Sequence, residues 1–379
     1  MVDAAFAISD DGRMRGNDLG DAPIEASAQP LVQRPHTPSV RSVVMALSGM
    51  VSALLVALLV VLPAPFMIET AGPTFDVFDG ELEGTTLVTV DGATTYASSG
   101  ELRLTTVAVS HTSDTPFSLG PVVRAWLDPA SIVYPDIPVE ANREEAVQQE
   151  WISSQEMASV AALGELGTAV PAEIRIADFS PGSRAEGKLM VDDIIVSVDG
   201  KEILTLPDLS AAIGAHAPGD QVTVVVARAG KDVTATFPTI QAQSGKTLMG
   251  VAIDPTFDMP YSVNVAIDHV GGPSAGLIFS LAIVDLLTPE DELQGAKVAG
   301  TGTISPNGDV GRIGGIPLKM IGARRAGADW FLAPESNCSE VVGHIPAGLR
   351  VVSVATLSEA YDAIVAIGSS SADDLPTCS

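Results

Sequence analysis

The sequence contains only two cysteines, Cys338 and Cys378, among 379 residues. So few cysteines exclude a disulfide-rich scaffold and a cysteine-ligated zinc cluster. The two thiols could pair in an oxidising compartment. The sequence leaves that question open, because pairing depends on geometry that a sequence does not give.

Basic residues are also scarce. The chain has 20 Lys and Arg against 47 Asp and Glu, which gives a formal net charge of −27. Nucleic acids and anionic membrane surfaces attract basic faces, so this balance argues against both as partners. A hydrophobic content of 46% over this length supports packed cores in two or three domains.

Two catalytic signatures are missing. No HExxH segment is present, which argues against a metalloprotease. Residues 245–247, Gly-Lys-Thr, match the end of a phosphate-binding loop, but Ile240 stands where that motif needs its first glycine. We therefore expect a chain that works without nucleotide, metal or other cofactor.

One long apolar run is present at residues 43–62, which is uncharged and rich in Val, Leu and Ala. About 20 such residues span a bilayer as a helix. We favour an uncleaved anchor over a cleaved signal peptide, because the run is long and no clear small-x-small cleavage site follows it. Residues 1–40 are polar and without periodicity, so we expect a disordered tail there.

The flanks of this run predict its orientation. No Lys or Arg lies between residues 65 and 102, whereas four arginines precede the run: Arg13, Arg15, Arg34 and Arg41. The positive-inside rule therefore predicts a cytoplasmic N-terminus and places the domains after the anchor on the extracytoplasmic side of the cell membrane.

Between the anchor and the next domain, residues 72–162 read as a β-rich and helical connecting region. Residues 82–109 alternate like strands and residues 140–163 are helix-like. No catalytic group stands out in this region.

Residues 163–240 combine short strands with a helix at 207–215 and a turn at 218–220. This order resembles a PDZ domain, with Asp192 standing where most members have glycine. Such domains bind an extended peptide by strand addition and capture its terminal carboxylate on backbone N–H groups. By position, the resemblance assigns that loop to Leu163, Gly164, Glu165 and Leu166. The other reading, a spacer without a ligand, stays open.

The main chemical signal lies at residues 271–276, Gly-Gly-Pro-Ser-Ala-Gly, which run directly into an apolar segment at 277–287. Small neighbours leave the Ser274 hydroxyl accessible, and unpaired N–H groups at a helix start suit a developing oxyanion. A hydroxyl also needs a base within hydrogen-bond reach. No G-x-S-x-G signature surrounds this serine, whereas Lys319 follows an apolar segment, and a desolvated lysine has a lowered pKa.

Taken separately, Ser274 reads as a helix N-cap and Lys319 as a solvated lysine in the first turn of a helix. Taken together with the Ala-Gly-Thr-Gly-Thr-Ile segment at 299–304, they resemble the proteolytic domain of the Lon family. The resemblance covers residues 250–367. It implies that Ser274 is the nucleophile, that Lys319 is the general base, and that the Thr301 hydroxyl helps to hold the dyad.

The same resemblance implies that the residues around the nucleophile shape its loop and its oxyanion site: Gly272, Pro273 and Ala275. One departure is visible, since Gly271 replaces the aspartate that many members carry three residues before the serine. The resemblance also implies peptide or protein substrates and a homo-oligomer.

We therefore expect an α+β chain with an N-terminal transmembrane helix, a PDZ-like domain, a C-terminal Lon-type proteolytic domain and a mobile tail at 368–379. The predicted function is a membrane-anchored, ATP-independent serine endopeptidase acting on extracytoplasmic proteins. One alternative is an inactive protease-fold adaptor that presents its PDZ domain. Another is a Ser–His–Asp hydrolase using Asp268 and His269, although neighbours on a strand point to opposite faces.

Overall fold

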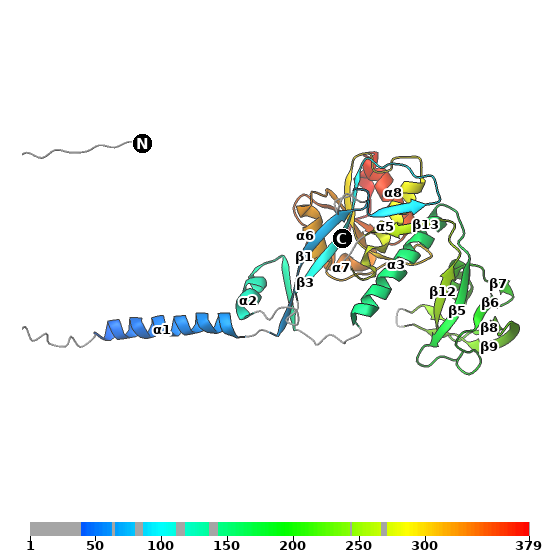
Figure 1. Ribbon diagram of the computed structural model, residues 1–379, viewed down its shortest axis with the longest axis horizontal. Coiled ribbons are helices and arrows are strands. Elements are labelled where there is room, and N and C mark those ends of the chain that lie inside the picture. The colour runs from blue at the N-terminus through cyan, green and yellow to red at the C-terminus, as the bar shows by residue number, and fades with distance from the viewer. Residues whose placement is uncertain are drawn as a thin grey trace, which may run out of the picture. The chain divides into compact units, whose positions relative to one another are not determined.

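The computed structural model describes residues 39–62, 65–79, 86–110, 118–135, 143–242, 245–266 and 271–378 (Figure 1). The chain divides into two units, Met1–Ala57 and Leu58–Ser379. The predicted disordered tail lies almost wholly outside the described residues.

The first described element is helix α1, Val40–Val61, which has 22 residues and no buried side chain. At 1.5 Å per residue it is about 33 Å long, enough for the hydrocarbon core of a bilayer. It is the one helix among the described residues that is long and apolar enough to cross a membrane. A signal sequence would pass the same test, so the helix is a candidate anchor.

The larger unit contains a mixed six-stranded sheet in the order β18-β17-β14-β3-β1-β4. Strand β1 is antiparallel to its two neighbours, β3 and β4, whereas β3, β14, β17 and β18 run parallel to one another. The strand bounds are Phe66–Asp76 (β1), Glu101–Ser110 (β3), Ser131–Pro135 (β4), Lys297–Gly300 (β14), Trp330–Pro334 (β17) and Arg350–Val354 (β18).

Alternating side chains give this sheet two buried faces. In β17, Leu332 joins the core under α3 (Arg143–Glu165), α5 (Gly276–Leu287) and α8 (Leu357–Gly368). Its neighbour Phe331 joins a second core under α6 (Ile316–Arg325) and α7 (Cys338–Val341). Because helices cover both faces, β14, β17 and β18 are mostly apolar, and the exposed Lys297 and Arg350 lie at the first positions of their strands.

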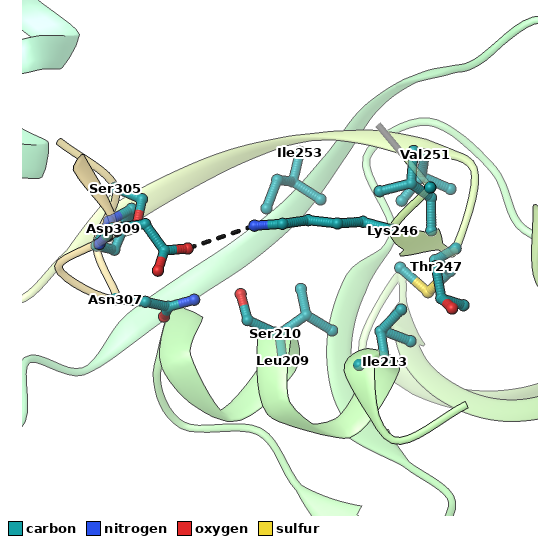
Figure 2. A pocket seen from close by; sticks show the side chains of 15 residues that line it. Leu209, Ser210, Ile213, Lys246, Thr247, Val251, Ile253, Ser305, Asn307 and Asp309 are labelled. Carbon is teal, nitrogen blue, oxygen red and sulfur yellow. Dashed lines mark hydrogen bonds and ion pairs between the residues drawn. The ribbon is translucent and has the colours of Figure 1, made fainter. Parts of the chain in front are cut away.

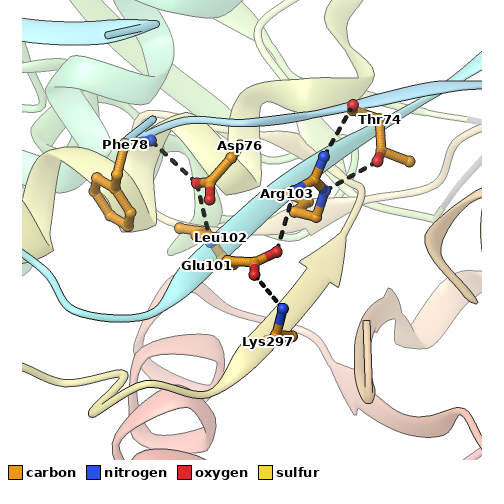
Figure 3. Close-up of polar contacts among 7 residues, drawn as sticks. All are labelled: Thr74, Asp76, Phe78, Glu101, Leu102, Arg103 and Lys297. Atoms are coloured by element: carbon orange, nitrogen blue, oxygen red, sulfur yellow. Dashed lines mark hydrogen bonds and ion pairs between the residues drawn. The ribbon is translucent and has the colours of Figure 1, made fainter. Parts of the chain in front are cut away.

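A polar network ties β1, β3 and β14 together at one end of the sheet (Figure 3). Arg103 donates to Thr74 Oγ1 at 3.0 Å and to Glu101 Oε2 at 3.1 Å, and Lys297 pairs with the other oxygen of Glu101. The hydrogen bond from Lys297 lowers the pKa of Glu101. Burial raises the pKa of Asp76, which accepts the Leu102 amide at 3.3 Å.

The second domain is a sheet in the order β12-β5-β6-β8-β9, with the short strand β7 paired to β6. Its apolar core includes Phe237 and is covered by helix α4 (Leu206–Gly214). The strand bounds are Ala172–Phe179 (β5), Ile194–Val198 (β6), Lys201–Glu202 (β7), Gln221–Arg228 (β8), Lys231–Pro238 (β9) and Val251–Phe257 (β12). Asp192, at the predicted glycine position, has a φ of 70°.

Four short strands form two antiparallel pairs, of which only the second is a hairpin. These are β2 (Val88–Asp91) with β13 (Ser262–Val265), and β15 (Thr303–Ile304) with β16 (Val310–Gly311). The remaining elements are the strands β10 (Ile240–Gln241) and β11 (Thr247–Leu248), the helix α2 (Leu119–Leu127) and the 3-10 turns η1 (Pro273–Ala275), η2 (Glu335–Asn337) and η3 (Ala372–Asp374).

Two expectations about domain organisation are wrong. The region 72–162 is not a separate connector, because β1 and β3 belong to the six-stranded sheet and α3 packs on α5. The second domain is therefore inserted between α3 and β13 of the domain that contains the six-stranded sheet. Sequence reading separated these segments because their pairing partners lie almost 200 residues apart.

The prediction of a mobile tail at 368–379 is also wrong for residues 368–378, which the structure describes. Cys378 forms a disulfide with Cys338, with Cα atoms 4.9 Å apart. The Pro376 carbonyl accepts the Ser353 amide at 2.9 Å, and Leu375 packs against the main core. These contacts hold a polar, serine-rich segment that composition alone suggested was free.

Candidate active site

Ser274 lies in the 3-10 turn η1, directly before the buried helix α5. The turn begins after Gly272, whose φ of 85° lies in the left-handed region that favours glycine. Pro273 then fixes the first helical position. This local sequence places the serine at the start of a helix that the core holds along most of its length.

Lys319 comes from the other face of the sheet, on helix α6. That helix begins after Gly315, which has a φ of 69°, and Pro317 lies in its first turn. The lysine is 3% exposed. Its Nζ donates to Ser274 Oγ at 2.8 Å and to Thr301 Oγ1 at 2.9 Å.

Thr301 connects the two residues. Its hydroxyl accepts a hydrogen bond from Lys319 and donates one to the Ser274 carbonyl oxygen at 2.9 Å. The same carbonyl accepts the Gly302 amide at 2.9 Å. Because Thr301 directly follows β14, the sheet fixes the position of the Ser274 loop relative to Lys319.

Burial lowers the pKa of Lys319 to about 8. Both of its hydrogen-bond partners, Ser274 and Thr301, are neutral hydroxyls, so neither favours the charged ammonium as a carboxylate would. A lysine in this state gives up its proton in the range in which a general base must work.

The three residues assigned to the serine loop differ in what they can do. Pro273 has no N–H and cannot receive an oxyanion. Its carbonyl accepts the Ser154 hydroxyl at 3.2 Å and the Gly276 amide, which fixes the loop against α3. Ala275 is buried at the first turn, and Gly272 supplies the bend before it.

A hollow of about 350 Å³ lies beside this loop. Pro273 and Ile304 line it from the catalytic segment, and Ser153, Ser154 and Met157 line it from α3. Sequence reading assigned no site role to α3. The signal was its run of small and medium residues, which lets the helix approach the serine loop closely.

The predicted peptide-binding loop is not a loop. Leu163, Gly164 and Glu165 form the end of α3, and Leu166 follows them. Leu163 packs with Val160 in a small core instead of facing a ligand. Helix α3, which begins at Arg143, extends through Glu165, whereas the sequence pattern predicted that the helix ends at 163.

The structure instead shows a groove of about 700 Å³ between α4 and β12 (Figure 2). Residues 245–249, which include the Gly-Lys-Thr segment that resembled a phosphate loop, lie at its rim. Gly250, with a φ of 85°, leads into the alternating strand β12. A glycine followed by alternating apolar residues was the signal that sequence reading did not use.

Asp268 and His269 lie outside the described residues. Among the residues that the structure does describe, no group of three or more His, Cys, Asp or Glu side chains could hold a metal ion.

Comparisons with known proteins match both domains. Residues 160–239 match the family model of the PDZ domain, and residues 263–367 match that of the Lon protease (S16) C-terminal proteolytic domain. Lon protease of Fusobacterium nucleatum is 40% identical over 91 residues, which cover 24% of this chain and 12% of that protein. Lon protease 1 of Herpetosiphon aurantiacus is 32% identical over 132 residues, or 30% of this chain and 16% of that protein.

Among solved structures, the PDZ domain of an SdrC-like protein from Listeria monocytogenes is 17% identical, with a TM-score of 0.21. The match covers 21% of this chain and 86% of that one. The chain thus spans a small part of the length of the curated Lon proteases that it matches. It combines a PDZ domain with a C-terminal proteolytic domain of the Lon (S16) family.

Proposed function

We propose that this protein is a membrane-anchored serine endopeptidase that hydrolyses peptide bonds without ATP. The observation that carries the proposal is the hydrogen bond of 2.8 Å between a buried Lys319 Nζ and Ser274 Oγ. The match to a Lon proteolytic domain supports serine peptidase chemistry at this site.

In the proposed mechanism, neutral Lys319 takes the proton from Ser274 Oγ as that oxygen attacks the peptide carbonyl. The Oγ–C bond forms, and backbone amides of the turn that carries Ser274 stabilise the negative oxygen. Lys319 then gives its proton to the leaving amine as the C–N bond breaks. Water, deprotonated by the same lysine, hydrolyses the acyl-enzyme and frees Ser274.

Thr301 acts as a positioning residue in this mechanism. Its hydroxyl accepts a hydrogen bond from Lys319 and donates one to the Ser274 carbonyl, so it fixes both the base and the nucleophile. Preorganised geometry of this kind lowers the barrier because little rearrangement is needed in the transition state.

The proposal places the catalytic domain outside the cytoplasm. Helix α1 supplies the anchor, and the arginines before it favour a cytoplasmic N-terminus. The disulfide between Cys338 and Cys378 supports an oxidising compartment, where such bonds persist. Substrates would then be extracytoplasmic peptides or proteins, and the family resemblance favours a homo-oligomer.

We propose that the PDZ domain captures peptides in the groove beside β12. This strand lies at the edge of its sheet, paired among the described strands with β5 alone. An edge strand offers backbone N–H and C=O groups for strand addition. The groove residues, and not those at the end of α3, are the proposed contacts.

The test uses the full chain in detergent micelles and a fluorogenic unstructured peptide. Hydrolysis by the wild type and its loss in Ser274→Ala support the proposal, while Ser262→Ala on the exposed face of β13 controls for general damage. An inactive wild type that still binds peptides would favour the adaptor alternative. Protease added to intact cells should digest the region after residue 65 and spare the N-terminal tail.

A further inference from the structure

The PDZ groove has a wall that belongs to the catalytic domain, and an ion pair between the two domains spans it. We propose that this composite groove selects, among the peptides with a free C-terminal carboxylate that a PDZ domain binds, those with a basic side chain about three residues upstream. The peptide replaces the ion pair of Lys246 with Asp309 by two intermolecular pairs. This inference rests on the proposed peptide-binding role of the PDZ domain and adds the chemistry of its ligand.

The floor of the groove suits an extended apolar peptide. Leu209 and Ile213 face it from α4, and Val251 and Ile253 face it from β12. Side chains two residues apart on a strand share one face, so a peptide added to β12 places every second side chain towards α4.

The opposite wall is the turn of the β15–β16 hairpin, which contributes Ser305, Pro306, Asn307 and Asp309. The Asp309 amide donates to Ser305 Oγ at 3.0 Å, and the Ser305 amide donates to the Asp309 carbonyl at 3.0 Å. On its far side, the Gly308 carbonyl accepts the Leu357 amide at 2.8 Å. The turn is therefore a fixed surface of the catalytic domain.

The ion pair joins Lys246 Nζ to Asp309 Oδ2 at 3.5 Å. Figure 2 shows the lysine side chain extending along the groove, past Ile253, to reach the aspartate. The two side chains are 75% and 56% exposed. Exposed pairs of this kind contribute little net stability, so a ligand can displace the contact at small cost.

Displacement leaves one cation and one anion facing the same groove. A terminal carboxylate suits Lys246, near the turn at Gly250 that precedes β12, because successive backbone N–H groups at such turns also attract carboxylates. A basic side chain suits Asp309 at the other end. A lysine side chain is about 6 Å long and its ammonium lies 3.5 Å from Asp309, so the Lys246 backbone and the Asp309 carboxylate are separated by about three residues of extended peptide.

The test measures binding of fluorescent decapeptides to the full chain carrying Ser274→Ala, which prevents cleavage. The peptides end in Val, free or amidated, and carry Lys, Gln or Glu two to four residues before the end. We expect the free Lys peptide to bind about fivefold to tenfold more tightly than the Glu peptide in low salt, and less selectively in 0.5 M NaCl.

Variants of the wall separate the possible outcomes. Asp309→Asn should abolish the preference for Lys, and Asp309→Lys should invert it towards Glu. Asp232→Lys, on the far edge strand β9 of the same sheet, is the matched control and should leave the preference unchanged.

Equal binding of all free-carboxylate peptides, unaffected by Asp309→Lys, would overturn the role of the turn while leaving PDZ peptide capture intact. No binding by any peptide would overturn both. In each case, hydrolysis of the fluorogenic peptide by the chain that retains Ser274 reports on the dyad independently.

Discussion

The ionisation of Lys319 should be visible directly in the rate of peptide hydrolysis. Burial lowers its pKa to about 8. Only the neutral lysine can accept the proton of Ser274, so the rate follows the neutral fraction. With this pKa the fraction is about one-tenth at pH 7, one-half at pH 8 and nine-tenths at pH 9, a rise of roughly ninefold across that range.

Two substitutions at Lys319 test the cause of this step. Lys319→Arg keeps the positive charge but cannot lose its proton at an accessible pH, so it should be as inactive as Ser274→Ala. Lys319→Ala should be inactive as well, because the proton acceptor is gone. His269→Ala should keep the wild-type step, since the proposed base is elsewhere.

The assay is kcat/KM for a fluorogenic peptide between pH 6 and 10, at constant ionic strength, for the full chain in detergent. A single rising step near pH 8 supports the reasoning. Substantial activity of Lys319→Arg, or a step that disappears in His269→Ala, would refute it and return the histidine reading to consideration.

Three further outcomes concern stability, measured as thermal or urea unfolding of the same protein. Lys319→Met should stabilise the fold by up to about 3 kcal/mol at pH 7, because the lowered pKa of Lys319 in the folded state means that its charged form is destabilised by burial. This gain should vanish towards pH 10.5, where the lysine of the unfolded chain also loses its proton. Asp285 is buried and its pKa is raised by burial and by Glu292, so wild-type stability should fall as pH rises above about 4, and Asp285→Asn should remove that slope. Gly300→Ala would place a Cβ 2.8 Å from Ile278 Cδ1 and 3.2 Å from the Leu332 carbonyl oxygen, and should cost about 1–3 kcal/mol. An unchanged midpoint would show that Ile278 and β17 move aside freely.

The dyad residues could be predicted from the combination of local motifs, although each residue alone also fits a structural role. Ser274 lies between small residues before an apolar helix, and Lys319 follows a glycine and a proline that start another helix. The structure brings the two within hydrogen-bond distance, and Thr301, which the resemblance assigned to the dyad, accepts a hydrogen bond from Lys319. Their catalytic roles remain a prediction that the pH experiment tests.

The domain boundaries could not be predicted because they depend on long-range pairing. Strand β3 pairs with β14 across almost 200 residues, and β-propensity alone does not identify a strand's partner. The PDZ loop was misplaced for a related reason. The end of α3 offers a glycine between apolar residues, but helical continuity from Arg143 onward determines its conformation.

The way in which the PDZ domain is inserted explains why the catalytic turn at 305–309 reaches its groove. Helix α3 packs along α5 behind Ser274, and its last residues, with Val170, form a small core that also contains Phe257 and Tyr261. These last two residues lie at the end of β12 and just before β13, so both connections between the domains are anchored in one apolar cluster. A flexible linker would let the domains separate, whereas two anchored connections restrict the PDZ domain to one region of the catalytic surface. The position of Asp309 beside Lys246 is therefore a consequence of the fold, and a groove shared by both domains follows from the same insertion.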